Sequence, residues 1–273
     1  MTVAEFRESK GCGPPLVCVT AYDAPFAQVA ECAGVDAILV GDSVGRAVLG
    51  YTNEFPVTVS DIVHHTAAVT RAVNNTLVVA DLPYQSYATP DDALRNAATL
   101  LQTGGAAAVK IEGGLATANI TKELVNRGMP VMAHVGLTPQ SAHVLGGYRV
   151  QGKGLSEAQE IVNGAQAQAN AGAFAIVLEM LPAKLAGAIT KHVTIPTIGI
   201  GAGVHCDGQI QVLHDLLGLS SSDFRHSHVF AEIASISEAA LSEYAQQVRS
   251  GDFPSLEQSF KGRRGTVKRL TFE

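Results

Sequence analysis

One pattern recurs along this sequence: a short apolar run that ends in a charged or titratable side chain. Residues 37–40, for example, read AILV and lead into Gly41, Asp42 and Ser43. A continuous apolar run of this length is typical of a strand that is buried on both faces of a parallel sheet. Parallel strands end at the same edge of their sheet, so we expect the side chains that end these runs to lie close together. They are Asp42, Asp81, Lys110, Glu112, His134 and Glu179.

The segments between these runs carry the apolar spacing of amphipathic helices. For residues 90–103, Thr89 is a candidate N-cap and Pro90 occupies the first turn. Strands that alternate with helices predict a parallel sheet with right-handed crossovers. Seven or eight such units fit in 273 residues. This number favours a closed (β/α)8 TIM barrel in a single α/β domain over an open sheet.

The last units of the predicted barrel are the least regular. Residues 197–201 are predicted to form the seventh strand, and residues 207–217 the helix after it, with Asp207 as the N-cap. The one candidate for an eighth strand is the LGL segment at residues 217–219. A final helix is predicted over residues 237–249.

The barrel domain is predicted to span residues 1–260, and residues 261–273 form a basic tail. We expect this tail to be flexible and solvated. The alternative is an arm that packs on a neighbouring subunit.

Composition narrows the class of protein. A net charge of −6, few aromatic residues and no tryptophan argue against a nucleic-acid-binding surface. No apolar stretch is long enough to span a bilayer, and the first ten residues lack the apolar core of a signal peptide. The four cysteines are scattered without a CxxC pair, as in proteins with reduced thiols. We therefore expect a cytoplasmic enzyme without membrane or nucleic-acid partners.

Three of the strand-end groups are carboxylates, from Asp42, Asp81 and Glu112. Carboxylates that lie close together raise one another's pKa unless they share a cation. A few oxygen ligands, with positions left for water or substrate, suit Mg2+ better than Zn2+. The sequence therefore predicts a Mg2+ site. The alternative for each acid taken alone is a strand-end cap or an ion pair with a lysine or arginine.

The other strand-end groups allow binding and acid–base chemistry. Lys110 faces the same side of its strand as Glu112, where it could bind a substrate carboxylate or an enolate oxygen, or neutralise the acids. His134 could contact substrate or transfer a proton, or be a core histidine. Glu179 follows four apolar residues, and apolar surroundings make a carboxylate a stronger base for a weak carbon acid. A fourth metal ligand or a structural acid is the alternative for Glu179.

A glycine-rich turn at residues 199–203 follows the predicted seventh strand. Such turns bind phosphate in many barrels, but close backbone packing explains them equally well. The strand-end groups by themselves describe a divalent-metal enzyme that acts on a small, oxygen-rich acid. A metal chelated by a 2-oxo acid acidifies the neighbouring C–H bond, which points to an enolate.

Nine short segments, spread from residue 20 to residue 203, carry a more specific signal. They are TAYD (20–23), VGDS (40–43), PVTV (56–59), ADLP (80–83), YATP (87–90), VKIEGG (109–114), HVGLTPQ (134–140), GGY (146–148) and GIGAG (199–203). In these segments the chain resembles the ketopantoate hydroxymethyltransferase family. The resemblance extends from about residue 10 to residue 260 with nearly unchanged spacing.

The resemblance implies an enzyme that transfers a hydroxymethyl group from 5,10-methylenetetrahydrofolate to 3-methyl-2-oxobutanoate through a Mg2+-stabilised enolate. The product is 2-dehydropantoate, on the pathway of pantothenate biosynthesis. The family fold is a (β/α)8 barrel related to phosphoenolpyruvate mutase and isocitrate lyase. The family typically forms a cytoplasmic homodecamer, so the resemblance also implies a homo-oligomer.

The resemblance assigns roles to matching positions. Asp42 and Asp81 would bind Mg2+ directly, and Glu112 would complete the shell, in one arrangement through water. Asp42 and Ser43, together with Asp81 and Lys110, would hold the 2-oxo acid.

The remaining roles concern proton transfer. Glu179 would be the base that removes the C3 proton, and His134 would orient or polarise the substrate. The chain departs from the family at residues 53–55, within residues 223–232 and in the tail after Phe260. The departure at residues 53–55 implies a differently shaped lid, and the tail implies a different assembly contact. The segment within residues 223–232 lacks the Lys-rich stretch of the family, which speaks against a basic anion contact there. None of the three departures touches the strand-end groups.

Two rival functions stay open. One is another metal-dependent C–C lyase or mutase of the same superfamily, although no cysteine follows residues 110–114 as in isocitrate lyase. The other is a non-catalytic barrel that binds a keto acid or a sugar phosphate as a sensor.

Overall fold

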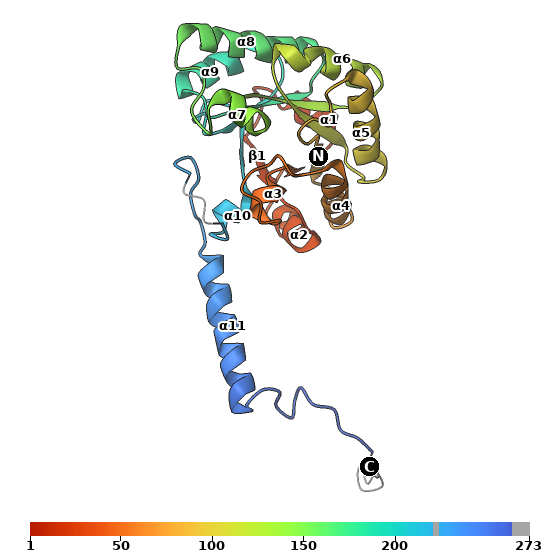
Figure 1. Cartoon of the computed structure of the whole chain (residues 1–273), viewed down its shortest axis with the longest axis vertical. Helices are drawn as coiled ribbons and strands as arrows, with labels where there is room; N and C mark the ends of the chain where they lie inside the picture. The colour runs from red at the N-terminus through yellow and green to blue at the C-terminus, as the bar shows by residue number, and fades with distance from the viewer. Residues whose placement is uncertain (221–223, 264–273) are drawn as a thin grey trace.

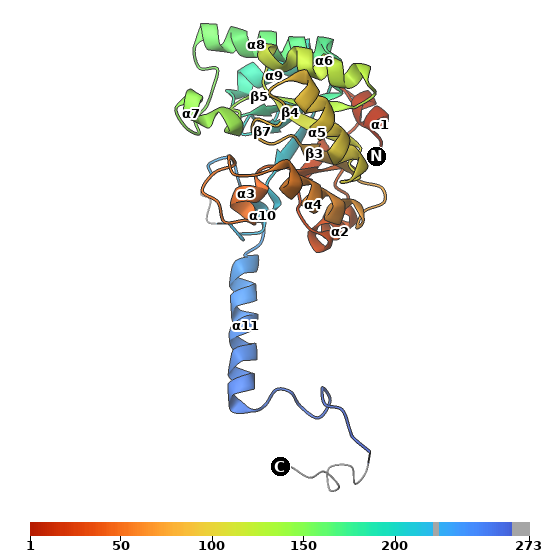
Figure 2. The same cartoon turned by 45° about the vertical axis from the view of Figure 1, so that its right-hand side comes forward.

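The apolar runs of the sequence form the strands of one closed parallel barrel. The computed structural model describes residues 1–220 and 224–263. Within these residues eight strands pair in chain order, and the last strand closes the barrel on the first. Figures 1 and 2 show helices packed around the barrel and one long helix that projects away from it. The predicted (β/α)8 TIM barrel is confirmed.

The strands alternate with helices through most of the chain. The strands are β1 (Leu16–Thr20), β2 (Ala37–Val40), β3 (Leu77–Asp81), β4 (Ala108–Glu112), β5 (Val131–Gly136), β6 (Ala175–Glu179), β7 (Thr197–Ile200) and β8 (Gly208–Gln211). The helices are α1 (Val3–Glu8), α2 (Ala24–Cys32), α3 (Val44–Ala47), α4 (Val59–Thr70), α5 (Pro90–Gln102), α6 (Ala118–Asn126), α7 (Ala142–Leu145), α8 (Leu155–Asn170), α9 (Ala183–His192), α10 (Leu213–Leu216) and α11 (Ile233–Ser250). Short 3-10 turns cover Leu115–Thr117 and Pro139–Ser141.

Local sequence signals set several helix starts. Thr89 caps α5 as predicted, because its hydroxyl accepts a hydrogen bond from the Asp92 backbone N–H at 3.2 Å. Thr58 caps α4 in a reciprocal arrangement with Asp61. These caps fix the residue at which each helix begins, and therefore the length of the loop that precedes the helix.

The barrel interior is filled with apolar side chains. Phe6 of α1 is fully buried and packs edge-to-face on Phe174, with ring centroids 5.7 Å apart. Phe6 belongs to the same cluster as the first residues of several strands, so α1 covers the amino-terminal end of the barrel. The polar strand ends are therefore left at the opposite, carboxyl-terminal end. The interior cluster includes Leu39, Val79, Met132, Val177, Ile198 and Ile210.

The eighth strand lies where the sequence pattern predicted a helix. β8 takes the first part of the helix predicted over residues 207–217, of which only residues 213–216 are helical, as α10, so this prediction is right in part. Residues 217–219 follow α10 without forming a strand, so the predicted eighth strand was wrong. A Cβ on Gly208 would lie 2.6 Å from the Leu16 carbonyl oxygen and 2.9 Å from Ile198 Cδ1. Glycine thus allows β8 to approach both neighbours and close the barrel, which is a long-range requirement that local periodicity does not report.

Asp207 does not cap a helix. Its Oδ2 accepts hydrogen bonds from Lys10 Nζ at 2.7 Å and from the Thr197 backbone N–H at 2.8 Å. The side chain therefore ties the segment after α1 to the start of β7, and the predicted N-cap was wrong.

The predicted final helix is confirmed as α11, which stands clear of the barrel in both views (Figures 1 and 2). None of its residues is buried. Most of the basic tail predicted over residues 261–273 lies outside the described residues. In the part of the chain that the structure describes, no helix is both long and apolar enough to cross a membrane.

Candidate active site

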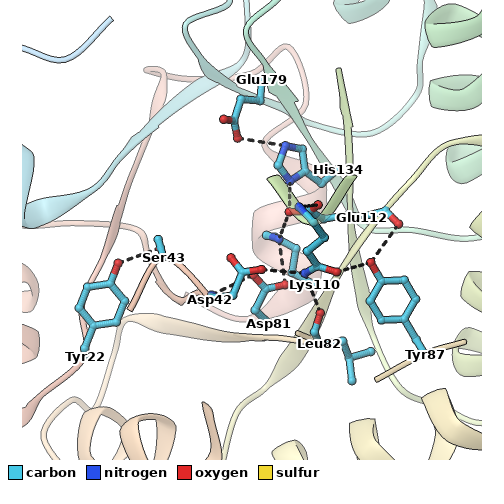
Figure 3. Close-up of polar contacts among 11 residues, drawn as sticks. Tyr22, Asp42, Ser43, Asp81, Leu82, Tyr87, Lys110, Glu112, His134 and Glu179 are labelled. Carbon is cyan, nitrogen blue, oxygen red and sulfur yellow. Dashed lines mark hydrogen bonds and ion pairs between the residues drawn. The ribbon is translucent and has the colours of Figure 1, made fainter. Parts of the chain in front are cut away.

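The predicted strand-end groups meet at the carboxyl-terminal rim of the barrel, and all of them line one cavity (Figure 3). This cavity encloses about 970 Å3 out to its open mouth. The strand-end groups come from successive strands, as expected for a (β/α)8 barrel. They are Asp42 after β2, Asp81 in β3, Lys110 and Glu112 in β4, His134 in β5 and Glu179 at the end of β6.

Strand register brings a lysine between the carboxylates. Asp81 of β3 pairs with Lys110 of β4, and Lys110 Nζ lies 2.8 Å from Asp81 Oδ1 and 3.5 Å from Glu112 Oε1. The Asp42 backbone N–H donates to Asp81 Oδ2 at 3.2 Å. These four residues are at most 4% exposed, so little solvent screens their charges.

The cluster has more buried negative charge than Lys110 can neutralise. Burial, reinforced by Asp81 and Glu112, raises the pKa of Asp42 well above its usual value. Burial alone would lower the pKa of Lys110, but the surrounding carboxylates raise it, which keeps the lysine charged. Such a site favours the entry of a further cation.

Gln140 holds two of the carboxylates and was not singled out in the sequence. Its Nε2 donates to Asp42 Oδ2 at 2.8 Å, and its backbone N–H donates to Glu112 Oε2 at 3.0 Å. The Tyr87 hydroxyl donates to Gln140 Oε1 at 2.6 Å and fixes the orientation of the amide. The only sequence signal for Gln140 is its place in the HVGLTPQ segment.

The donor set fits an ion that takes few protein ligands. In residues 1–220 and 224–263, no three histidine, cysteine, aspartate or glutamate side chains converge closely enough to hold a metal ion by themselves. The Asp42 and Asp81 side chains are buried next to each other, because the Asp42 N–H donates to the Asp81 carboxylate. The Glu112 carboxylate is held beside them by the Gln140 N–H and by Lys110 Nζ. Mg2+ commonly binds through one or two carboxylates and keeps several waters.

His134 lies between Glu112 and Glu179. Register places Glu112 beside His134, and the imidazole Nδ1 is 3.4 Å from Glu112 Oε1 while Nε2 is 3.2 Å from Glu179 Oε2. Both contacts are ion-pair distances rather than well-aligned hydrogen bonds. Burial alone would lower the pKa of His134, but the two glutamates raise it to about 9. A charged imidazole therefore connects Glu179 to the acidic cluster.

The chain turns sharply directly after Glu179. Met180 adopts a φ of 47°, a strained conformation for a residue other than glycine. Its N–H donates to the Ile200 carbonyl at 2.8 Å, and its carbonyl accepts from the Gln151 N–H at 2.9 Å. These bonds hold the turn and leave the Glu179 side chain 15% exposed in the cavity.

Two further sequence predictions can be placed. The Ser43 hydroxyl lines the cavity and lies 2.8 Å from the Tyr22 hydroxyl. Close packing accounts for the glycine-rich turn, because Gly201 has a φ of 61° and a Cβ there would lie 3.2 Å from the His226 ring and 3.3 Å from Met180 Cγ.

The mouth of the cavity contains a cluster that sequence reasoning missed. Arg46 Nη1 lies 3.8 Å from Glu54 Oε1, and the Tyr148 hydroxyl donates to Glu54 Oε2. The Arg46 guanidinium lies 5.4 Å from the centre of the Tyr148 ring and 5.1 Å from that of Phe224. These residues come from the loops after β2, β5 and β8, so only the fold brings them together.

Sequence relatives cover nearly the whole chain. The enzyme named 3-methyl-2-oxobutanoate hydroxymethyltransferase from Thermus thermophilus is 52% identical over 261 residues, which is 95% of this chain and 99% of the relative. The protein of that name from Carboxydothermus hydrogenoformans is 48% identical over 262 residues, covering 95% of each chain.

Solved structures share the fold at low sequence identity. A phosphonopyruvate hydrolase superposes with a TM-score of 0.62 at 16% identity, covering 98% of this chain and 94% of the other. A 2,3-dimethylmalate lyase, described as a member of the PEP mutase/isocitrate lyase superfamily, gives a TM-score of 0.58 at 17% identity over 95% and 91% of the two chains.

The family model for ketopantoate hydroxymethyltransferase matches residues 1–256, which include every strand of the barrel and every strand-end group of the cavity. Together with relatives about half identical over nearly the whole sequence, this match shows that the chain belongs to the ketopantoate hydroxymethyltransferase family.

Proposed function

We propose that this protein transfers a hydroxymethyl group from 5,10-methylenetetrahydrofolate to C3 of 3-methyl-2-oxobutanoate and forms 2-dehydropantoate for pantothenate biosynthesis. The observation that carries the proposal is the placement of Glu179 in the same cavity as the Asp42, Asp81, Lys110 and Glu112 cluster. The Asp42, Asp81, Lys110 and Glu112 cluster suits a 2-oxo acid, and the Glu179 carboxylate in the same cavity can remove a proton from it. Family membership supports the same reaction.

The acidic cluster fits a Mg2+ ion. Asp42 and Asp81 would hold it directly, and Glu112 would contact it through water, in keeping with the lack of a closer three-ligand set in the described ranges. A bound Mg2+ supplies polarisation of the 2-oxo group, which acidifies the neighbouring C3–H bond.

The protein's own residues perform the remaining steps. Ser43 and Lys110 hold the carboxylate and oxo oxygens, and the lysine charge stabilises the negative charge that develops there. Glu179 removes the C3 proton, and His134 holds the Glu179 carboxylate in place. The resulting enolate carbon forms a bond to the methylene carbon of the donor. Water supplies the hydroxyl oxygen as both C–N bonds of the donor methylene break, and the two tetrahydrofolate nitrogens take up the C3 proton, by way of Glu179, and one proton from water.

Exchange of the C3 proton of 3-methyl-2-oxobutanoate in D2O tests this function without the donor. We expect the protein to catalyse exchange with Mg2+ and to stop when EDTA removes the metal, as followed by loss of the C3–H signal in proton NMR. A folded protein that shows no metal-dependent exchange contradicts the proposal. A sensor barrel would bind the acid without exchange, and a C–C lyase would release a smaller fragment.

We also propose that the protein is a cytoplasmic homo-oligomer, with a homodecamer as the form that the family resemblance suggests. The support in this chain is α11, whose apolar side chains Ile236, Leu241, Tyr244 and Val248 are 46–67% exposed. They recur at helical spacing and define one apolar face on a helix that stands clear of the barrel (Figure 2). A second copy of the chain is the partner that would cover such a face.

Leu241→Lys is expected to shift the protein to a smaller assembly, because it places a charge in the apolar face of α11. Sedimentation velocity or light scattering gives the mass of each species. Gln246→Lys, an exposed position on the other side of the same helix, is the matched control and should keep the parent mass. An unchanged mass for Leu241→Lys contradicts a role for this face.

A further inference from the structure

One wall of the cavity has no role in binding the 2-oxo acid or in removing its C3 proton. The acid-binding groups and Glu179 come from β2 to β6, whereas the wall beyond β7 is formed by β8, α10 and described residues that follow them, among them Phe224 and His226. We call the residues Gln211, Asp215, Phe224 and His226 the β8 wall, and all four line the cavity. A small 2-oxo acid held at the acidic cluster leaves this wall uncovered.

The β8 wall presents hydrogen-bond acceptors. Gln211 Nε2 donates to the His226 carbonyl at 3.1 Å, which identifies the other amide atom as the oxygen. This oxygen, Oε1, is buried and has no hydrogen-bond partner within the described structure. Asp215 is 7% exposed, and its Oδ1 accepts a hydrogen bond from the Ser220 hydroxyl. A buried acceptor without a partner is costly, so a ligand that donates N–H groups is expected here.

The same wall carries an aromatic pair, and the Arg46 guanidinium lies over the Phe224 ring. The Phe224 and His226 rings are stacked, with centroids 5.3 Å apart and planes inclined by 19°. The His226 ring packs against Gly201, next to Met180, and Met180 directly follows Glu179 in the chain. A ring that contacts this aromatic pair would therefore lie beside the proposed base.

We propose that the β8 wall is the subsite for the heterocycle of the one-carbon donor, a planar ring that carries N–H groups along one edge. The edge donates to Gln211 Oε1 and to the Asp215 carboxylate, and the ring contacts the Phe224 and His226 side chains that line the same wall. This inference rests on the proposed function, because it assigns the second substrate of that reaction. It places the donor on the Glu179 side of the 2-oxo acid, where a bond to C3 can form.

Three substitutions in the β8 wall test the inference. Gln211→Leu removes the unpaired acceptor and is expected to raise the KM for 5,10-methylenetetrahydrofolate about fivefold to tenfold. Asp215→Asn removes a charged acceptor, with an expected increase of about tenfold to a hundredfold. Phe224→Leu removes one ring of the aromatic pair. Calorimetric titration with tetrahydrofolate, in the presence of Mg2+ and the 2-oxo acid, measures the corresponding change in Kd.

Gln209→Leu is the matched control. Gln209 lies on the same strand as Gln211 and its Nε2 also donates to a backbone carbonyl, that of Gly203 at 3.0 Å. It lies outside the residues that line the cavity in the described chain. We expect the parent KM and Kd for this variant, and the thermal unfolding midpoint checks that each variant is folded.

C3 proton exchange, which needs no donor, separates the two proposals. The inference is supported when the donor KM and the tetrahydrofolate Kd rise in the wall variants while exchange continues. It is overturned when folded Gln211→Leu, Asp215→Asn and Phe224→Leu all bind tetrahydrofolate as the parent does. Loss of exchange in Asp215→Asn also overturns it, because Asp215 would then act with the acid-binding groups. Absence of exchange in the parent protein contradicts the proposed function instead.

Discussion

Replacing Glu179 by glutamine is expected to lower the rate of C3 proton exchange by about a hundredfold to ten-thousandfold, which is the usual contribution of a general base. Glutamine keeps the shape of the side chain but cannot accept the proton. Binding of the 2-oxo acid should change little, because the acid is held by groups on β2 to β4 rather than by Glu179. Exchange monitored by NMR gives the rate, and calorimetric titration with the acid and Mg2+ gives the Kd.

Glu54 provides a matched control for this substitution. Its carboxylate lines the same cavity but lies at the mouth, paired with Arg46 and Tyr148. Glu54→Gln is therefore expected to retain exchange. If Glu179→Gln exchanges the C3 proton at the parent rate, another group is the base and the proposed role of Glu179 is wrong.

Replacing Lys110 by methionine is expected to lower the free energy of unfolding by about 3–5 kcal/mol. The substitution keeps an unbranched side chain, one atom shorter, and removes the positive charge that lies 2.8 Å from Asp81 Oδ1. The carboxylates of Asp42, Asp81 and Glu112 would then stay buried without the lysine charge, and the charged His134 imidazole contacts only Glu112 among them. Urea denaturation in metal-free buffer measures the change, and exchange should be lost in the same variant.

Two further variants show whether charge is the cause. Lys184→Met removes an exposed lysine and should change the free energy of unfolding by no more than about 0.5 kcal/mol. Asp81→Asn combined with Lys110→Met should cost less than the sum of the two single substitutions, because each removes the partner of the other. Unchanged stability of Lys110→Met contradicts the interpretation of the cluster as a set of charges that needs this lysine.

The strand-end groups could be predicted because parallel strands impose a simple geometry. An apolar run marks a buried strand, and the polar residue after it marks the carboxyl-terminal end of that strand. Alternation with helices makes the strands parallel, so all these ends lie on the same side of the barrel. The prediction for Lys110 and Glu112 also uses the alternation of side chains along a strand, because residues two apart face the same side. The sequence alone therefore predicts that these groups lie close together, and in the structure they line one cavity.

The eighth strand shows where this reasoning stops. β8 is short, and its GQIQ sequence has no apolar run. The strand exists because its backbone fills the last gap between β1 and β7, and Gly208 permits the close approach. A pattern within a few residues contains no information about such a gap.

Sequence by itself determined the barrel, the start of α5 and the identity of the strand-end groups, because these depend on local periodicity, capping residues and the shared direction of parallel strands. Only the tertiary structure decided that Gln140 bridges Asp42 and Glu112, that Arg46 meets Glu54 at the mouth and that Gln211 keeps an unpaired oxygen. These contacts join loops that are far apart along the chain. Their partners are chosen by the packing of the closed barrel, which no single segment specifies.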